Sequence, residues 1–371
     1  MRSLRVTAAL VVALLTGALL PEAAGAGMLA RPASGVLAQA HIGGRVEVDR
    51  GAVKYSWPGI YFEGRFRGTG IGIVLDDADN DYDIAIDGTT AATLVTPGRT
   101  THWIHGLAPG THRIRLVKRT EIPWAAGAFG GFIAAPGGAI LAKPSARSRQ
   151  IEFIGDSYTV GYGNTSPSRD CTAAEVNRTT DADQSFGARA ARRLNADYQI
   201  NAFSGRGMIR NYNGGEPGTD YRTYYDRALL NIDGNIWKNP GTWRPQLVVV
   251  GLGINDFSTA INPGEQWTPE TLITAYRTAY QAFIDKLRAQ YGPRTIIVVS
   301  ATYLYNTTIY AETAHQIVQD RNTNGDNRIR YWYYESEGLD YSGCHWHPSL
   351  HDHQLIAKRL TNYIAALPLR W

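Results

Sequence analysis

The chain has 371 residues, of which 44% are hydrophobic and 19% are charged, and its formal net charge is +4. A chain of this length and composition is typical of a globular protein with roughly two domains and a sizeable core. The small net charge gives no reason to expect binding to nucleic acid or to an anionic membrane.

The first residues have the pattern of an export signal. Arg2 and Arg5 precede an apolar run over residues 6–20, and small residues follow at 24–26. This order predicts a secretory signal peptide over residues 1–26 and a secreted or periplasmic protein. A retained anchor helix is the alternative, although the apolar run is short for a membrane span. No other stretch could cross a membrane, so we expect no membrane association after cleavage.

Residues 27 to about 40 are small and polar, and we expect a tether with little to bury. Residues 42–142 then alternate strand-like runs with turn signals such as Asp87-Gly88, Pro97-Gly98 and Pro109-Gly110. Many short strands with regular turns predict an antiparallel β-sandwich of the jelly-roll type. The expected strands are 45–49, 53–57, 60–67, 70–75, 82–86, 93–96, 101–105, 111–118, 129–134 and 139–142.

A short polar joint at 143–149 precedes a region, 150–371, in which strands alternate with helices. The expected strands are 150–154, 198–203, 246–251, 295–301 and 328–334, and the expected helices are 185–194, 269–290, 311–320 and 349–366. Continuously apolar runs such as 247–250 and 296–299 are typical of central parallel strands. The pattern predicts a three-layer α/β/α domain with a parallel five-stranded sheet.

Gly155-Asp156-Ser157 follows the first of these strands. Open α/β sheets bind ligands at the carboxyl ends of their strands, so Ser157 is a candidate nucleophile. A free hydroxyl is a poor nucleophile, and it needs a base and donors for a developing oxyanion. An ordinary Asp-Ser turn is the alternative.

Three later segments lie at the same edge of the expected sheet. Gly205 follows the second strand, where a glycine lets a backbone N–H approach a ligand. Asn255 follows the third strand and offers an amide donor, and His347 precedes the last helix, which we expect Pro348 to open. Each has a structural alternative: a turn at Gly205, a helix cap at Asn255, and a solvent-exposed histidine before a proline.

In this order, the four segments resemble the conserved blocks of the SGNH hydrolases, also called the GDSL esterase superfamily. The resemblance covers about residues 150–371. It implies that Ser157 is the nucleophile and His347 the base. It also implies an oxyanion hole made by the backbone N–H groups of Ser157 and Gly205 and by the Asn255 side chain.

The chain is more closely similar to the family two carbohydrate esterases, which deacetylate plant polysaccharides. The likeness rests on the preceding jelly roll and on the sequences at 158–163, 204–212 and 346–349. It implies a secreted esterase that removes O-acetyl groups from xylan or glucomannan, needs no cofactor, and takes an acetylated polysaccharide or oligosaccharide as substrate. Four aromatic residues flank the site and are expected to stack on sugar rings or, alternatively, to serve only in packing: Tyr158, Tyr162, Tyr212 and Trp346.

The sequence departs from the family pattern around the histidine. Many SGNH hydrolases have an aspartate three residues before it, where this chain has Cys344, and the nearer relatives often have an acid where this chain has His345. The nearer family is known for a Ser-His dyad whose base is oriented by a backbone carbonyl, and we expect the same here. Four acidic residues remain as possible substitutes: Glu335, Glu337, Asp340 and Asp352.

Cys171 and Cys344 are the only cysteines, and an exported chain with one pair predicts a disulfide. Two buried thiols are the alternative. The histidines at 345, 347, 351 and 353 have irregular spacing interrupted by Pro348, so no metal site is expected. A polysaccharide-binding protein with weak or no esterase activity is the second function considered, and the sequence indicates no oligomeric state.

Overall fold

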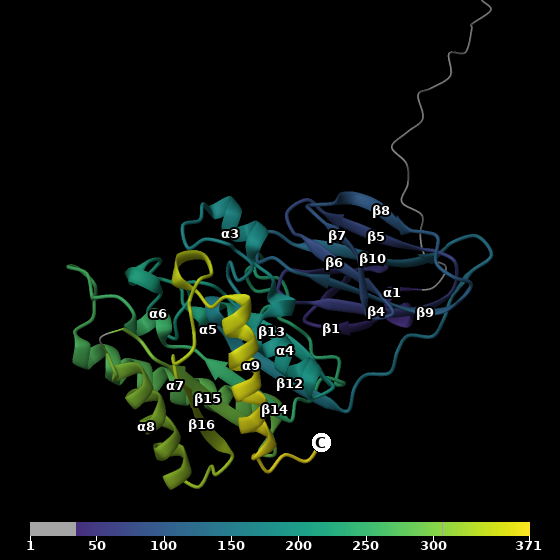
Figure 1. Ribbon diagram of the computed structural model, residues 1–371. Helices are drawn as coiled ribbons and strands as arrows, with labels where there is room; N and C mark the ends of the chain where they lie inside the picture. The colour runs from purple at the N-terminus through teal and green to yellow at the C-terminus, as the bar shows by residue number, and fades with distance from the viewer. Residues whose placement is uncertain (1–34, 306) are drawn as a thin grey trace, which may run out of the picture.

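The computed structural model describes residues 35–305 and 307–371, so the expected signal peptide lies outside the described residues. Two antiparallel sheets face each other in the first half of the chain (Figure 1). One has the order β1 (His41–Gly43), β4 (Tyr61–Gly68), β9 (Gly110–Lys118), β6 (Tyr82–Ile86) and β7 (Thr89–Leu94), with β11 (Ala139–Ile140) on β4. The other has the order β2 (Glu47–Asp49), β3 (Ala52–Tyr55), β10 (Gly127–Ala134), β5 (Ile71–Asp77) and β8 (Gly98–Ile104).

The β-sandwich expected from the alternating pattern is therefore confirmed. In β9, for example, Ile114 and Leu116 are buried in the core of the sandwich, while Arg115 between them pairs with Asp183 of the second domain at 2.8 Å. β7 begins four residues earlier than expected because Asp87 and Gly88, both with positive φ, form a two-residue hairpin turn that lets the next strand start at once.

The expected tether was wrong in its last part. Residues Val36–Gln39 form the short helix α1, and Val36 and Ala40 are buried in the core of the sandwich. The Gln39 side chain accepts the backbone N–H of Phe132 at 2.9 Å. Val36 and Leu37 are the only large apolar residues of this short segment, and two adjacent residues give no periodicity, so this docking was not visible in the sequence.

A parallel sheet forms the second half, in the order β13 (Ala196–Ala202), β12 (Arg149–Gly155), β14 (Leu247–Gly251), β15 (Ile296–Thr302) and β16 (Ile329–Tyr334). The helices α4 (Phe186–Arg193) and α9 (Leu350–Ala365) cover one face, and α7 (Pro269–Tyr291) and α8 (Ile309–Thr323) cover the other (Figure 1). The predicted three-layer domain is confirmed. Several shorter helices were missed because one or two turns show no period: α2 (Ser157–Val160), α3 (Ala173–Thr179), α5 (Tyr221–Tyr225) and α6 (Ile254–Phe257).

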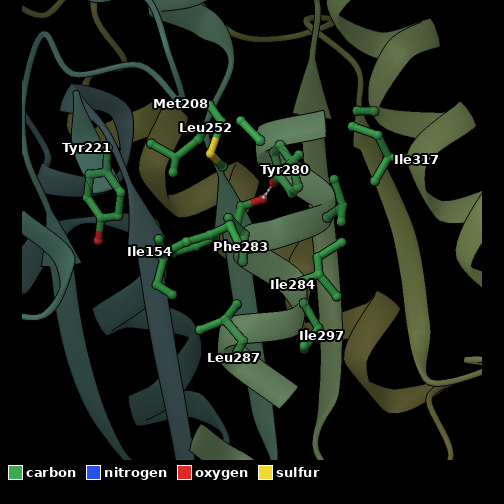
Figure 2. Packing of buried hydrophobic residues seen from close by; sticks show 14 of the residues in the cluster. Ile154, Met208, Tyr221, Leu252, Tyr280, Phe283, Ile284, Leu287, Ile297 and Ile317 are labelled. Carbon is green, nitrogen blue, oxygen red and sulfur yellow. Dashed lines mark hydrogen bonds between the residues drawn. The ribbon is translucent and has the colours of Figure 1, made fainter. Parts of the chain in front are cut away.

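The core beneath α7 fixes the loops that follow two of the strands. Figure 2 shows Phe283, Ile284 and Leu287 of α7 among side chains of the sheet. Met208 and Leu252 belong to the loops after β13 and β14, yet both side chains are fully buried in the same cluster. Burying each one stabilises the fold by roughly 1.5–3 kcal/mol, so these loops are anchored at the edge of the sheet.

The two domains share a buried polar and apolar interface. Tyr61 of β4 belongs to the core cluster of the parallel-sheet domain, and its hydroxyl donates to Asp197 of β13 at 2.8 Å. Arg45 lies fully buried and pairs with Glu152 of β12 at 2.9 Å. Within residues 35–305 and 307–371, the helices are too short or too polar for any of them to cross a membrane.

Candidate active site

Three strands of the parallel sheet end at the same level. Gly155, the last residue of β12, pairs with Ala202 of β13 on one side and with Gly251 of β14 on the other. β12 is the first strand of this sheet in chain order but lies between the second, β13, and the third, β14, so the connections leave it in opposite directions. Such a reversal opens a crevice at the carboxyl edge, which explains why segments distant in sequence meet there.

Ser157 and His347 meet in this crevice. Ser157 begins α2, whose N-cap Asp156 accepts the backbone N–H of Tyr158 at 3.1 Å. The Ser157 Oγ lies 2.9 Å from Nε2 of His347. On the other side of the ring, Nδ1 donates to the carbonyl oxygen of Cys344 at 2.9 Å and lies 3.2 Å from that of His345. A carbonyl only accepts, so these contacts place the proton on Nδ1 and leave Nε2 free to accept the serine proton.

No carboxylate among the described residues forms a hydrogen bond with His347. Of the four acids considered from the sequence, Asp352 is fully buried, but its oxygens accept the backbone N–H groups of Asp340 and Tyr341, each at 2.8 Å. The carbonyl of Cys344 thus takes the place next to Nδ1 that an aspartate has in many related hydrolases.

The turn that carries His347 is strained and tightly held. His345 and Trp346 both adopt positive φ, 52° and 63°, which costs side-chain-bearing residues energy. The predicted disulfide between Cys171 and Cys344 is confirmed and joins this turn to the 169–171 segment. From that segment, the guanidinium of Arg169 lies 3.9 Å from the ring centroid of Trp346, and the backbone carbonyl of Cys171 lies 2.8 Å from Nε2 of His345.

The start of α9 and a nearby glycine both affect the turn that carries His347. α9 begins at Leu350 with Ser349 as its N-cap, so Pro348 precedes the cap and does not open the helix, as the sequence had suggested. The position of His347 is therefore set by the turn. Gly163 has φ +56°, and a Cβ there would lie 2.4 Å from Cβ of Cys344 and would push the turn away.

Potential oxyanion donors converge on the same crevice. Neither the N–H of Ser157 nor that of Gly205 has an acceptor among the described residues. Asn255 is buried and gives one amide proton to the carbonyl of Arg206 at 2.9 Å, which leaves its second proton for a ligand. Together these groups can stabilise negative charge that develops near Ser157.

Asp256 is a residue whose contribution sequence reasoning missed. Its fully buried carboxylate accepts the backbone N–H groups of Met208, Ile209 and Arg210 at 2.8–2.9 Å. Burial raises the pKa of Asp256 to about 6 in spite of these bonds. The side chain ties the loop after β13 to the loop after β14, and its only signal in the sequence was its place beside Asn255.

The environment of His347 keeps its imidazole neutral. Burial lowers the pKa of His347 to about 4, against a smaller opposing effect of the two carbonyls at Nδ1. The ring of Tyr162 lies 4.4 Å from the imidazole between centroids, and that of Tyr158 lies 5.4 Å away. A neutral imidazole in contact with a serine hydroxyl is the arrangement that general-base catalysis requires.

Comparisons with known proteins identify the family of the chain. Residues 42–144 match the family model described as carbohydrate esterase 2 N-terminal, and residues 153–334 match that of the GDSL-like lipase/acylhydrolase family. An acetylxylan esterase / glucomannan deacetylase of Cellvibrio japonicus is 42% identical over 330 residues, which are 87% of this chain and 90% of that protein. The chain belongs to the family two carbohydrate esterases. It is a carbohydrate esterase with an SGNH hydrolase domain.

Other relatives of this esterase extend the likeness. The cellulase/esterase CelE of Acetivibrio thermocellus is 32% identical over 84% of this chain, which corresponds to 37% of that longer protein. A solved carbohydrate esterase whose active site displays divergent catalytic and non-catalytic binding functions is 39% identical, with a TM-score of 0.81 over 89% of this chain and 98% of the other. A family two carbohydrate esterase from Clostridium thermocellum, solved with cellohexaose, is 33% identical, with a TM-score of 0.75 over 87% of this chain and 98% of the other.

Aromatic side chains line the active-site cleft of the esterase, which has a volume of about 930 Å³. The structure separates the four expected from the sequence into two pairs. Tyr158 and Tyr162 pack against His347, whereas Tyr212 and Trp346 are 60% and 64% exposed in the cleft. The guanidinium of Arg169 lies over the ring of Trp346, so that ring has only its other face for a ligand. Sequence reasoning missed two more exposed rings in the cleft, Tyr303 and Tyr305, whose signal was their place directly after the fourth strand.

The histidines near the base do not gather around one point. His345 is held by Tyr162 and Cys171, and His353 is fully buried, with Nδ1 accepting the N–H of Phe186. The side chains of Asp340, His351 and Asp352 have ligand-type atoms within 4.8 Å of one another. Because Asp352 already accepts the backbone N–H groups of Asp340, Tyr341 and, in the capping box of α9, Ser349, this cluster has a structural role in the esterase.

Proposed function

We propose that the esterase removes O-acetyl groups from plant polysaccharides such as xylan or glucomannan through an acyl-enzyme on Ser157. The observation that carries this proposal is the 2.9 Å contact between Ser157 Oγ and His347 Nε2, beside backbone N–H groups that have no acceptor in the described part of the chain. This constellation can create a nucleophile and stabilise the charge that results from its attack.

In the proposed mechanism, Nε2 of His347 takes the proton of Ser157 as its oxygen attacks the acetyl carbonyl. The N–H groups of Ser157 and Gly205 and the amide of Asn255 bind the oxyanion. The sugar oxygen leaves with the proton from Nε2, and an acetyl ester remains on Ser157. His347 then deprotonates a water that attacks this ester, and acetate leaves as the serine regains its proton. The Cys344 carbonyl stabilises the imidazolium by accepting from Nδ1 throughout.

The polysaccharide substrate is supported by the cleft and by the relatives. The exposed rings of Tyr212 and Trp346 suit stacking on the apolar faces of sugar rings. The 42% identical relative is named for acetylxylan and glucomannan, and another relative was solved with cellohexaose. We propose that a β-linked sugar chain lies along these rings with an acetyl group directed at Ser157.

We further propose that the esterase acts outside the cytoplasm. The charged, apolar and small-residue order of residues 1–26 supports export. The disulfide between Cys171 and Cys344 supports it as well, because such bonds form and persist in oxidising compartments.

The proposal is tested by measuring acetate release from acetylated xylan and acetylated glucomannan, with nitrophenyl esters of long-chain acids as the comparison. We expect release from the glycans, little turnover of the long-chain esters, and a loss of several orders of magnitude in Ser157→Ala. Full activity in Ser157→Ala, or a preference for the long-chain esters, would contradict the proposal.

The second candidate, a binding protein with weak or no esterase activity, is favoured by the aromatic cleft and by the non-catalytic binding described for one relative. A pull-down on insoluble glycan beside the acetate assay distinguishes the two. Retention on the glycan without acetate release would favour the binding protein.

A further inference from the structure

A segment of the jelly-roll domain reaches the loop that carries Gly205. It connects β9 to β10, and its residue Glu121 directs the carboxylate across the domain interface. One carboxylate oxygen, Oε1, accepts the backbone N–H of Ser204 at 2.8 Å. Ser204 directly precedes Gly205 and lines the active-site cleft with it. A residue of the first domain is therefore one peptide unit away from an expected oxyanion donor of the second.

The segment around Gly205 is a tight turn whose central peptide needs support. The N–H of Arg206 donates to the carbonyl of Phe203 at 3.3 Å, and Gly205 has φ +78°, as the third residue of a type II turn has. The central peptide of such a turn contains the Ser204 carbonyl and the Gly205 N–H. Type I and type II turns differ in which way this peptide faces, so turning it over would move the N–H away from its ligand.

Contacts from several directions hold the turn in place. On its carboxyl side, the Gly205 carbonyl accepts the N–H of Tyr212 at 2.9 Å, and the Arg206 carbonyl accepts from the Asn255 side chain at 2.9 Å. On its amino side, Glu121 holds Ser204. Without Glu121, the backbone N–H of Ser204, the residue just before Gly205, would lose its hydrogen bond to the carboxylate.

Glu121 itself is well placed for this role. Burial raises its pKa, while the positive charges of Lys118 and Arg206 favour the ionised carboxylate. Arg119, two residues before Glu121, fixes the segment to the second domain, because its carbonyl accepts the N–H of Ala182 at 2.9 Å and its guanidinium lies 3.5 Å from Asp181.

We infer that Glu121 is a positioning residue for the oxyanion hole, so that the jelly-roll domain completes the active site. This inference rests on the proposed function, since it concerns the donor that would bind the oxyanion. Glu121 acts through Ser204 and the turn, and it is not among the described residues that line the cleft.

The test compares Glu121→Ala, which removes the acceptor, and Glu121→Asp, which keeps the charge but retracts it by one methylene, with Glu47→Ala. Glu47 is a matched control because it also joins the two domains, by accepting from the side chain of Asn235 at 2.6 Å, and lies outside the cleft. For each variant, kcat and KM for 4-nitrophenyl acetate, the inhibition constant of a boronic acid that adds to the serine, and Tm are measured.

We expect Glu121→Ala to lower kcat by about 10- to 100-fold, somewhat less than loss of a donor itself, with little change in KM. Boronic acid binding should weaken in parallel, since its tetrahedral adduct uses the same donors. The kcat of Glu121→Asp should lie between those of Glu121→Ala and the wild type, and Glu47→Ala should keep the wild-type kcat. Glu121→Asp also covers the case in which Glu121→Ala does not fold.

The inference would be overturned if the folded Glu121 variants kept kcat within twofold of Glu47→Ala, or if their loss lay in KM alone. Failure of the proposed function is recognised separately. In that case the wild-type protein itself would release no acetate and would not bind the boronic acid.

Discussion

The half-buried imidazole of His347 allows a quantitative prediction about pH. Because burial lowers the pKa of His347 to about 4, an acid limb of kcat/KM should lie near pH 4. At pH 5.5, about 97% of such imidazoles are neutral, whereas an ordinary histidine with a pKa of about 6.5 would be only about 9% neutral. Titration of His347 by itself should therefore leave nearly full activity at pH 5.5.

Exposing the His347 imidazole to water should shift the acid limb of the pH profile to higher pH. The ring of Tyr162 lies 4.4 Å from that of His347, so Tyr162→Ala would admit water and raise the pKa of the imidazole toward its ordinary value. Activity at pH 5.5, relative to that at pH 8, should then fall by up to about tenfold. Tyr212→Ala serves as the control, because Tyr212 lines the same cleft but is 60% exposed and should leave the limb unchanged.

The assay is acetate release from acetylated xylan, quantified by chromatography between pH 3.5 and 8. Between pH 6.5 and about 4, the unfolded chain binds a proton at His347 that the folded chain does not, so stability also falls as the pH falls. Circular dichroism at each pH confirms that the enzyme is still folded.

A second titration is expected from Asp156, because burial raises the pKa of its carboxyl to about 7. The variant Asp156→Asn identifies this titration, because it removes the carboxyl. The reasoning is refuted if the limb of His347 lies near 6.5 in the wild type, or if Tyr162→Ala leaves it in place.

Three further predictions follow from the contacts around the site. Asn255→Ala should lower kcat on acetylated xylan by about 10²–10³ with little change in KM, because one oxyanion donor is lost; an effect confined to KM would contradict that role. Replacing Cys171 and Cys344 together with serine should lower the free energy of unfolding, by as much as about 5 kcal/mol for a bridge across 173 positions, and should also lower kcat by loosening the turn of the proposed base. Urea denaturation and steady-state kinetics measure both effects, and unchanged values would show that the turn holds without the bridge. Tyr212→Ala and Tyr305→Ala should each raise KM for the polysaccharide by about threefold to tenfold, equivalent to about 1 kcal/mol, and leave 4-nitrophenyl acetate turnover unchanged; equal effects on both substrates would place these rings in the catalytic step.

The sequence predicted those parts of the protein that depend on neighbours in the chain. Apolar runs marked the strands of the parallel sheet, and alternating residues marked the sandwich. Because Ser157, Gly205 and Asn255 each follow a strand, their meeting at one edge could be predicted from the order of elements before any contact was known. The disulfide followed from the cysteine count and the export signal.

Some details of the site could not be predicted from residue types. The acceptor for Nδ1 of His347 is the backbone carbonyl of Cys344, and every residue has a carbonyl, so nothing in the sequence distinguishes this one. In the same way, the division of the aromatic residues into a pair that packs against His347 and a pair that faces the cleft depends on side-chain direction. The direction of each of these side chains is set by the residues that pack around it in the folded chain.

The contacts between the domains were determined by the tertiary structure alone. Glu121 and Ser204 lie in different domains and share no pattern, yet they are joined by a 2.8 Å hydrogen bond at the active site. Helix α1 likewise gains its stability from the core onto which it docks. Periodicity and turn chemistry act over a few residues and are therefore readable in the sequence. The placement of two surfaces against each other depends on the sum of many side-chain contacts, and that sum exists only in the folded chain.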